Sequence, residues 1–312
     1  MNKEKLIATR ESYGKAITEL CSKYEDLVVL DADLSKATKT DIFKAKYPER
    51  FFDCGIAEAN MIGVAAGLAA TGKIPVASTF AMFAAGRAFE QIRNSVGYPK
   101  LNVKICATHA GISVGEDGAT HQCNEDIALM RTIPGMTVVC PCDDLETKLA
   151  VKAALDTKGP FYIRLSRLAT AQINEEGYEF KLGKGVTLKD GNDITIISTG
   201  LMVERALDAA EILSKEGINA RVINIHTIKP IDEEIIIKAA EETKGIVVAE
   251  EHSKIGGLTS AVCEVLCRNC PAKVESVSVN DEFGMSGPAK QLLDHFNLNA
   301  DAIVSKAKKI LK

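Results

Sequence analysis

Short runs rich in β-branched residues alternate with longer segments of helical periodicity along the whole of this 312-residue chain. This alternation is typical of parallel sheets that are covered by helices on both faces. We therefore predict an α/β fold. The predicted strands are residues 26–32, 75–80, 103–109, 136–141, 161–166, 193–199, 220–226, 245–251 and 273–279.

The alternation is interrupted once, by a polar stretch at 171–190 that is rich in glycine and has no long periodicity. We interpret it as a linker or an edge region. A chain of this length can bury two cores of ordinary size. The sequence therefore predicts two tandem domains with mostly parallel sheets, at residues 1–170 and 191–312.

Charge and hydropathy exclude several classes of function. The formal net charge is −4 and no basic block or basic-aromatic stripe occurs, which gives no support to nucleic-acid binding. The first residues lack the apolar run of a signal peptide, and no stretch approaches about 18 uninterrupted apolar residues. We expect a soluble, cytoplasmic protein.

Nine cysteines without a secretory signal indicate reduced thiols rather than a disulfide framework. Cys263, Cys267 and Cys270 lie close together and raise the question of a metal site. Their spacing fits no standard zinc pattern, and the first two fall in a helical pattern where a buried cysteine behaves as a small apolar residue. We predict no metal site.

Glu58 follows a short extended piece and a glycine, in the first turn of a predicted helix at 58–71. A carboxylate there stabilises the helix dipole, which is one explanation for it. The helix itself is unusual because Gly63, Gly67 and several alanines give it very small side chains. Glycine inside a helix costs about 1 kcal/mol relative to alanine. We therefore expect this helix to pack tightly against another element or subunit.

The same helix ends in a partial match to a phosphate-binding P-loop at residues 67–73. The next residue is Ile74 rather than serine or threonine, and the glycines lie at a helix end instead of between strand and helix. We therefore exclude a nucleotide site here.

Two aromatic residues, Phe80 and Phe83, follow the strand at 75–80. They are either ordinary core residues or the walls of an apolar slot for a flat heteroaromatic ring, against which stacking gains about 0.5–1.5 kcal/mol beyond burial.

The segment 109–122 carries three glycines, two histidines and two acids, and it leaves a strand at its carboxyl end. Ligands of α/β sheets bind at that edge. The alternatives are a solvated loop, a metal site made by His109, Asp117 and His121, or a site for a polyol or phosphate. Arg164 and Arg167 are placed to contribute to an anion site.

In their order and spacing, these segments resemble the pyrimidine-binding and C-terminal domains of transketolases. The likeness extends over nearly the whole chain. The segments that carry it are GIAE (55–58), TF (79–80) with Phe83, GEDGATHQ (115–122), LSR (165–167), TIKPID (227–232), and HS (252–253) with GG (256–257).

The resemblance implies roles around thiamine diphosphate. Glu58 would hydrogen-bond the pyrimidine ring of the cofactor and promote the tautomer that removes the thiazolium proton. Phe83 would stack on that ring, with Phe80 as a wall, and Asp33 would lie near the thiazolium. Asp117 and His121 would bind the hydroxyls of a ketose donor. The phosphate end of the substrate would be held by His109, Arg167 and Arg10.

The sequence departs from the family pattern in two places. Ala37 stands where many transketolases carry a phosphate-binding serine, and no Gly-Asp-Gly followed at the usual distance by asparagine occurs. The resemblance therefore implies the C-terminal subunit of a split transketolase, active only with an N-terminal partner subunit. That partner is expected to hold the diphosphate and Mg²⁺ (or Ca²⁺). A closed heterotetramer of two plus two chains follows from a cofactor bound between chains.

Three other classes of protein are alternatives for this chain. A 1-deoxyxylulose-5-phosphate synthase normally has arginine in place of His109 and Tyr-Pro-Arg-Gly in place of residues 165–168. A 2-oxoacid dehydrogenase beta chain lacks the loop at 116–118 in this form. A non-catalytic regulatory or scaffolding paralogue is disfavoured by the retention of Glu58, Asp117 and His121.

Overall fold

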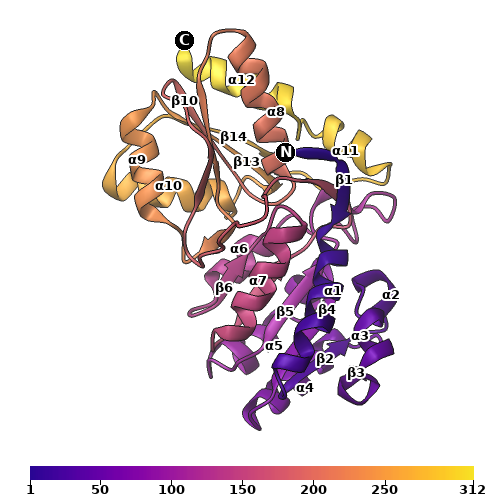
Figure 1. Ribbon diagram of the computed structural model, residues 1–312. Helices are drawn as coiled ribbons and strands as arrows, with labels where there is room; N and C mark the ends of the chain where they lie inside the picture. Colours follow the sequence, from indigo (N-terminus) through magenta and orange to yellow (C-terminus); the bar gives the residue numbers. More distant parts are fainter.

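A seven-stranded sheet forms the centre of the first half of the molecule (Figure 1). The structure is a computed structural model that describes residues 1–312. The strand order is β12-β6-β7-β5-β4-β2-β3, and every neighbouring pair is parallel except β12 with β6. The strands are β2 (Leu27–Asp31), β3 (Phe51–Asp53), β4 (Ile74–Phe80), β5 (Lys104–Thr108), β6 (Thr137–Val139), β7 (Phe161–Arg164) and β12 (Thr227–Lys229).

Helices cover both faces of this sheet. One face packs against α1 (Thr9–Leu20) and α7 (Asp144–Asp156), which share a buried apolar cluster with the strands. The other face packs against α4 (Glu58–Ala70) and α6 (Asp126–Thr132). Shorter elements complete this half: α2 (Ser35–Thr38), α3 (Asp41–Lys46), α5 (Phe89–Gln91), the π-helical segments η3 (Met82–Arg87) and η4 (Ile92–Gly97), and the 3-10 turns η1 (Cys21–Lys23), η2 (Pro48–Arg50) and η5 (Ile112–Val114).

The second half is built on a five-stranded sheet with the order β14-β13-β10-β11-β9, in which only the edge strand β9 is antiparallel. Helices α8 and α12 pack on one face and α9 and α10 on the other. The elements are β9 (Val186–Lys189), β10 (Ile194–Ser198), α8 (Met202–Lys215), β11 (Ala220–Asn224), α9 (Glu233–Glu242), β13 (Ile246–Ser253), α10 (Leu258–Asn269), β14 (Val274–Val279), α11 (Ala289–His295) and α12 (Ala300–Leu311).

The two halves are interlocked. Strand β12 leaves the second half to join the first sheet, and one buried apolar cluster runs through both halves. A separate antiparallel pair, β1 (Asn2–Ala8) with β8 (Ala169–Gln172), lies along the junction, where Lys3 bonds Asp208 of α8 (Figure 1). Between Gln172 and β9 the chain has no regular element.

The predicted α/β class with two tandem, mostly parallel sheets is confirmed. Each of the nine predicted strands coincides with an observed strand. Sequence patterns missed β1 because its residues are mostly exposed and show no alternation. They missed β3 and β12 because these three-residue strands, unlike β6, do not lie within a longer apolar run of the sequence.

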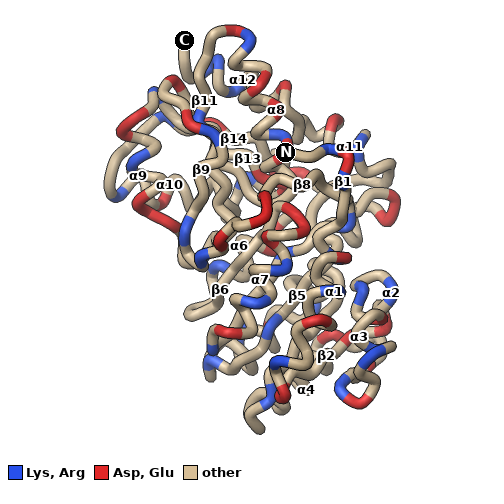
Figure 2. Tube along the Cα trace, viewed as in Figure 1, with Lys and Arg blue, Asp and Glu red and all other residues tan.

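Charged residues of both signs are intermixed along both halves (Figure 2), in keeping with the absence of a basic stripe in the sequence. None of the helices combines the length and the apolar character that crossing a membrane requires.

Candidate active site

The candidate residues gather at the carboxyl edge of the first sheet. Phe80 ends β4, while Asp33, His109 and Arg167 follow β2, β5 and β7 within three residues. Because these strands are parallel, their carboxyl ends lie along one edge, where α/β proteins bind ligands. Arg10, in the first turn of α1, reaches the same edge.

Four aromatic rings form a continuous stack at this edge. The ring centroid of Phe80 lies 3.8 Å from that of His109 and 5.7 Å from that of Phe83, with near-parallel planes. His121 meets Phe83 edge-on at 5.3 Å. Phe80 is buried and Phe83 is half-buried. The structure therefore brings Phe80, Phe83, His109 and His121 together.

His109 is held as a neutral imidazole. Its Nε2 lies 3.1 Å from Nη1 of Arg10, and its Nδ1 lies 2.8 Å from Oγ1 of Thr108. A guanidinium only donates, so Nε2 accepts from Arg10 and Nδ1 carries the proton that it donates to Thr108. Burial, together with the charges of Arg10 and Arg167, lowers the pKa of His109 to about 3.

Arg167 reaches back over the loop that follows His109. Its Nη1 donates to the carbonyl of Val114 and lies 3.5 Å from Oε2 of Glu116 and 3.6 Å from Oδ2 of Asp117. Burial and the positive charge of Arg167 lower the pKa of Arg10. Two guanidinium groups thus approach each other with carboxylates beside one of them, an arrangement suited to an anion with neighbouring hydroxyls.

Glu58 is the first residue of α4, and its side chain is 1 % exposed. Its Oε2 accepts a 2.7 Å hydrogen bond from Nη1 of Arg87, which is half exposed. The same guanidinium lies over the ring of Phe83, 4.4 Å from its centroid. Glu58 is therefore connected to the aromatic stack through Arg87.

Sequence reasoning did not single out Arg87. It stands four residues after Phe83, a spacing that places two side chains on one helical face. The signal was present but weak, because the segment is π-helical rather than α-helical and its register is not visible in the sequence.

Asp33 is the one candidate that the structure does not bring into contact with the others. It is exposed, with a φ of 61°, and its backbone amide bonds Oδ1 of Asp53 at 3.1 Å. The loop that carries it is organised by buried Asp31, which accepts bonds from Leu34, Thr38 and Thr40. Burial raises the pKa of Asp31 to about 6.

In residues 1–312 no group of three or more His, Cys, Asp or Glu side chains is arranged to hold a metal ion. This applies to His109, Asp117 and His121 and also to the three cysteines between 263 and 270, of which Cys267 is exposed. The chemistry available at the sheet edge is thus a buried carboxylate, stacked rings, two guanidinium groups and hydroxyl-binding acids.

Comparison with known proteins identifies the family. Residues 5–172 match the transketolase pyrimidine binding domain and residues 183–303 match the transketolase C-terminal domain. A putative transketolase C-terminal section from Methanocaldococcus jannaschii is 53% identical over 97% of this chain and 96% of its own length. The 6-deoxy-6-sulfo-D-fructose transketolase subunit SqwH of Clostridium sp. (strain MSTE9) is 45% identical over 96% of this chain and 94% of its own.

Among solved structures, a split gene transketolase in an inactive beta4 tetramer superposes with a TM-score of 0.90, at 51% identity over 98% of both chains. Both family models, the sequence relatives and this structure point to the same conclusion. The chain belongs to the transketolase family, as a chain similar to the C-terminal part of a split transketolase.

Proposed function

We propose that this chain is the C-terminal subunit of a split transketolase, which transfers a two-carbon ketol unit from a ketose to an aldose with thiamine diphosphate. One observation carries the proposal: the buried Glu58 carboxylate and the ring of Phe83, which the Arg87 guanidinium covers, share a single sheet edge with a cluster suited to an anion and hydroxyls. A carboxylate, a ring face and a sugar-binding cluster are the three parts that such a reaction requires of this chain.

The residues present fit the pyrimidine end of the cofactor. Glu58 is buried although its only side-chain partner is Arg87, a residue that is itself half exposed. The guanidinium of Arg87 is a flat group that lies over Phe83 while bonding Glu58, and in our proposal Arg87 moves aside and the pyrimidine takes this position. Under this proposal Glu58 and Phe83 hold the pyrimidine, Phe80 backs them, and Asp33 serves the thiazolium side.

The chemistry that thiamine diphosphate supplies when bound is a nucleophilic carbon that takes up and releases the two-carbon unit. Glu58 provides the proton acceptor and donor for the pyrimidine ring nitrogen. A positioned carboxylate contributes about 10²–10⁴-fold through general acid–base catalysis. The aromatic stack excludes water from that hydrogen bond and fixes the plane in which it forms.

The sugar-binding residues divide into two groups. Arg10 and Arg167 provide the positive charge for an anionic end of the substrate, and neutral His109 orients Arg10 through Nε2. Asp117 and His121 bind hydroxyls of the donor. Ala37 offers no hydroxyl, but its carbonyl accepts a 3.0 Å bond from Arg10. The anionic end is a phosphate in our proposal, and the relative named for a sulfo-sugar makes a sulfonate the alternative.

The open side of the site supports a partner chain. Gly63 and Gly67 of α4 have no atom of this chain within 4 Å of an added Cβ, and Ile56 beside Glu58 is 78% exposed. The similar split gene transketolase is an inactive beta4 tetramer. We propose an N-terminal partner subunit that carries the diphosphate and Mg²⁺ (or Ca²⁺), in a cytoplasmic heterotetramer of two plus two chains.

Co-purification of the partner, followed by a ketol-transfer assay with thiamine diphosphate and magnesium, tests the proposal. We expect transfer from the pair and none from either chain alone. Hydroxypyruvate, a phosphorylated ketose and a sulfonated ketose are compared as donors to identify the anionic end. Full transfer by this chain alone, or none by the pair with any donor, would contradict the proposal.

A further inference from the structure

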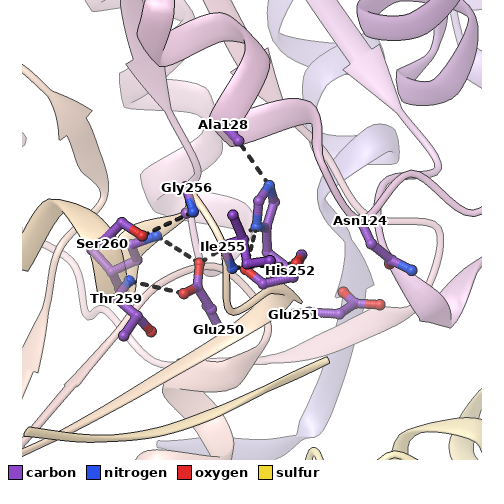
Figure 3. Close-up of polar contacts among 12 residues, drawn as sticks. Asn124, Ala128, Glu250, Glu251, His252, Ile255, Gly256, Thr259 and Ser260 are labelled. Carbon is purple, nitrogen blue, oxygen red and sulfur yellow. Dashed lines mark hydrogen bonds and ion pairs between the residues drawn. The ribbon is translucent and has the colours of Figure 1, made fainter. Parts of the chain in front are cut away.

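Three consecutive ionisable residues are buried at the carboxyl end of β13. Glu250, Glu251 and His252 are 0%, 3% and 0% exposed, respectively (Figure 3). Burying an ionisable side chain costs several kcal/mol unless it is hydrogen-bonded. Their partners therefore indicate what this segment does, and the two glutamates have different ones.

Glu250 bonds only within its own half of the molecule. Its carboxylate accepts from the backbone amides of Leu258, at 2.6 Å, and Thr259, at 2.8 Å (Figure 3). These amides are free donors in the first turn of α10, so Glu250 stabilises the start of that helix.

Glu251 points the other way, into the first half. Its Oε1 accepts from the backbone amide of Ser113 at 2.5 Å. Its carboxyl group also lies against Gly111, where an added Cβ would come within 2.4 Å of Cδ. Burial raises the pKa of Glu251, and its Oε2 has no hydrogen-bond partner. Burying Oε2 without a hydrogen-bond partner destabilises the fold. The hydrogen bond that Oε1 accepts from Ser113 offsets part of this loss.

Neighbouring contacts hold the same region. His252 accepts through Nε2 from the amide of Ala128 in α6, at 3.3 Å, and its Nδ1 donates to the carbonyl of Ser253 (Figure 3). Arg164 at the end of β7 pairs with Asp126 and donates to the backbone carbonyl of Glu251 at 2.8 Å. The end of β13 is therefore fixed relative to the first sheet, and Glu251 projects from a rigid base.

The loop that Glu251 contacts is the one that bears sugar-binding candidates. It begins directly after His109 and carries Asp117 and His121. Its far end is held by a second segment of the C-terminal half: Ser286 donates to the carbonyl of Glu116 at 2.6 Å, and Gln122 donates to the carbonyl of Met285 at 2.9 Å. The C-terminal half thus forms hydrogen bonds with the loop at Ser113 and again at Glu116 and Gln122.

We propose that Glu251 is a positioning residue of the C-terminal domain, whose carboxyl group anchors Ser113 and thereby places Asp117 and His121 for the donor sugar. This inference rests on the proposed function for its kinetic consequence, whereas the anchoring itself is a property of the chain alone. In this role the C-terminal domain closes the back of the sugar site without touching the substrate.

The anchoring is tested by amide hydrogen exchange of the whole chain, with Glu250 as the matched control. Both glutamates are buried neighbours, but only Glu251 contacts the loop. We expect E251A to speed exchange across residues 111–118 by at least about tenfold, the scale of leaving one buried amide without its acceptor. E250A should act on residues 257–260 instead. E251Q, which keeps an acceptor oxygen, should stay near wild type in the loop.

Kinetics of the variant chains assembled with the partner subunit test the consequence. E251A should lower kcat/KM for the ketose donor about 10- to 100-fold, mainly through KM, because small displacements of binding groups have effects of that size. E251Q should recover most of it and E250A should leave the KM unchanged.

The outcomes separate the two proposals. An unchanged loop in E251A, or equal KM changes in E250A and E251A, would overturn the positioning role. The expected exchange pattern together with no ketol transfer by the wild-type pair would instead leave the anchoring standing and remove the proposed function.

Discussion

Glu58 and Glu251 are both buried carboxyl groups, and we have proposed that both serve one site, but they lie in opposite kinds of surroundings. Glu251 is enclosed by the two halves of this chain and accepts from a backbone amide. Glu58 bonds one flexible side chain, the half-exposed guanidinium of Arg87. Close to Glu58 lie the exposed Ile56 and the uncovered Gly63. The surroundings of Glu251 are completed within the chain, whereas those of Glu58 are left open.

This contrast is the basis for our proposal that the chain binds another molecule beside Glu58. Backbone amides cannot leave Glu251 without unfolding the loop, so that contact exists in the lone chain. The half-exposed guanidinium of Arg87 can rotate toward water, but the buried carboxylate of Glu58 then needs another donor, because a buried charge without a partner is strongly destabilising. Under our two proposals the enclosed side sets the geometry of the site, and the open side accepts a cofactor and a partner. Four predictions test this contrast, and they follow in order of decreasing effect.

The largest effect is expected at the open side, from E58Q. Glutamine has the size of glutamate but lacks its proton-accepting carboxylate, so turnover of the assembled enzyme should fall about 10²–10⁴-fold. Steady-state assays measure the loss, and thermal unfolding should show a fold that is intact. Retention of more than half of normal turnover would show that Glu58 is not the proton acceptor.

Arg167 and Asp117 lie where the two sides meet, and their replacement should separate charge from hydroxyl recognition. R167A loses charge-assisted bonds worth about 1.5–3 kcal/mol each, so kcat/KM for phosphorylated donors should fall about 10- to 150-fold. Hydroxypyruvate should be nearly unaffected. D117A should instead reduce discrimination between donors of different hydroxyl configuration. Equal losses of R167A on both donor types would remove the phosphate assignment.

His109 is buried, and its low pKa should make the free energy of unfolding depend on pH. Its pKa of about 3 in the folded chain lies below the unfolded value of about 6.5. Between these values only the unfolded state holds the proton, so stability should fall as the pH drops through this window. The loss at pH 5 relative to pH 7 is about 2 kcal/mol. Urea unfolding of H109Q should lack this part of the pH dependence, and an equal slope in both proteins would contradict it.

The smallest effect is expected from a single methyl group on α4. G67A should stabilise the lone chain by up to about 1 kcal/mol, because alanine favours a helix and nothing in this chain opposes its Cβ. The same change should weaken association with the partner. Gly14 of α1 is the matched control, since its Cβ would come within 2.3 Å of the Lys39 carbonyl and G14A should destabilise. Unaltered partner affinity in G67A, measured by calorimetry, would mean that this face is not the interface.

Much of the fold was predictable because parallel strands buried on both faces leave continuous apolar runs in the sequence. β4, β5 and β10 are of this kind, and all were predicted. Strands β1 and β12 were not, because β1 is exposed and polar and β12 is short and owes its place to the sheet of the other half. Candidate residues at the end of an apolar strand can likewise be predicted from the sequence. Residues that act through a contact between the two domains cannot.

Local patterns were sufficient for the α/β class, the strand ends and the residues that follow them, because periodicity and turn chemistry are local properties of the chain. They therefore placed Phe80, His109 and Arg167 at one edge. Folding in three dimensions was needed to pair Arg87 with Glu58, to keep His109 neutral, to hold Asp33 apart and to bring Glu251 to Ser113. Those facts depend on helix register, on burial and on the packing of two domains, which join residues up to 138 positions apart.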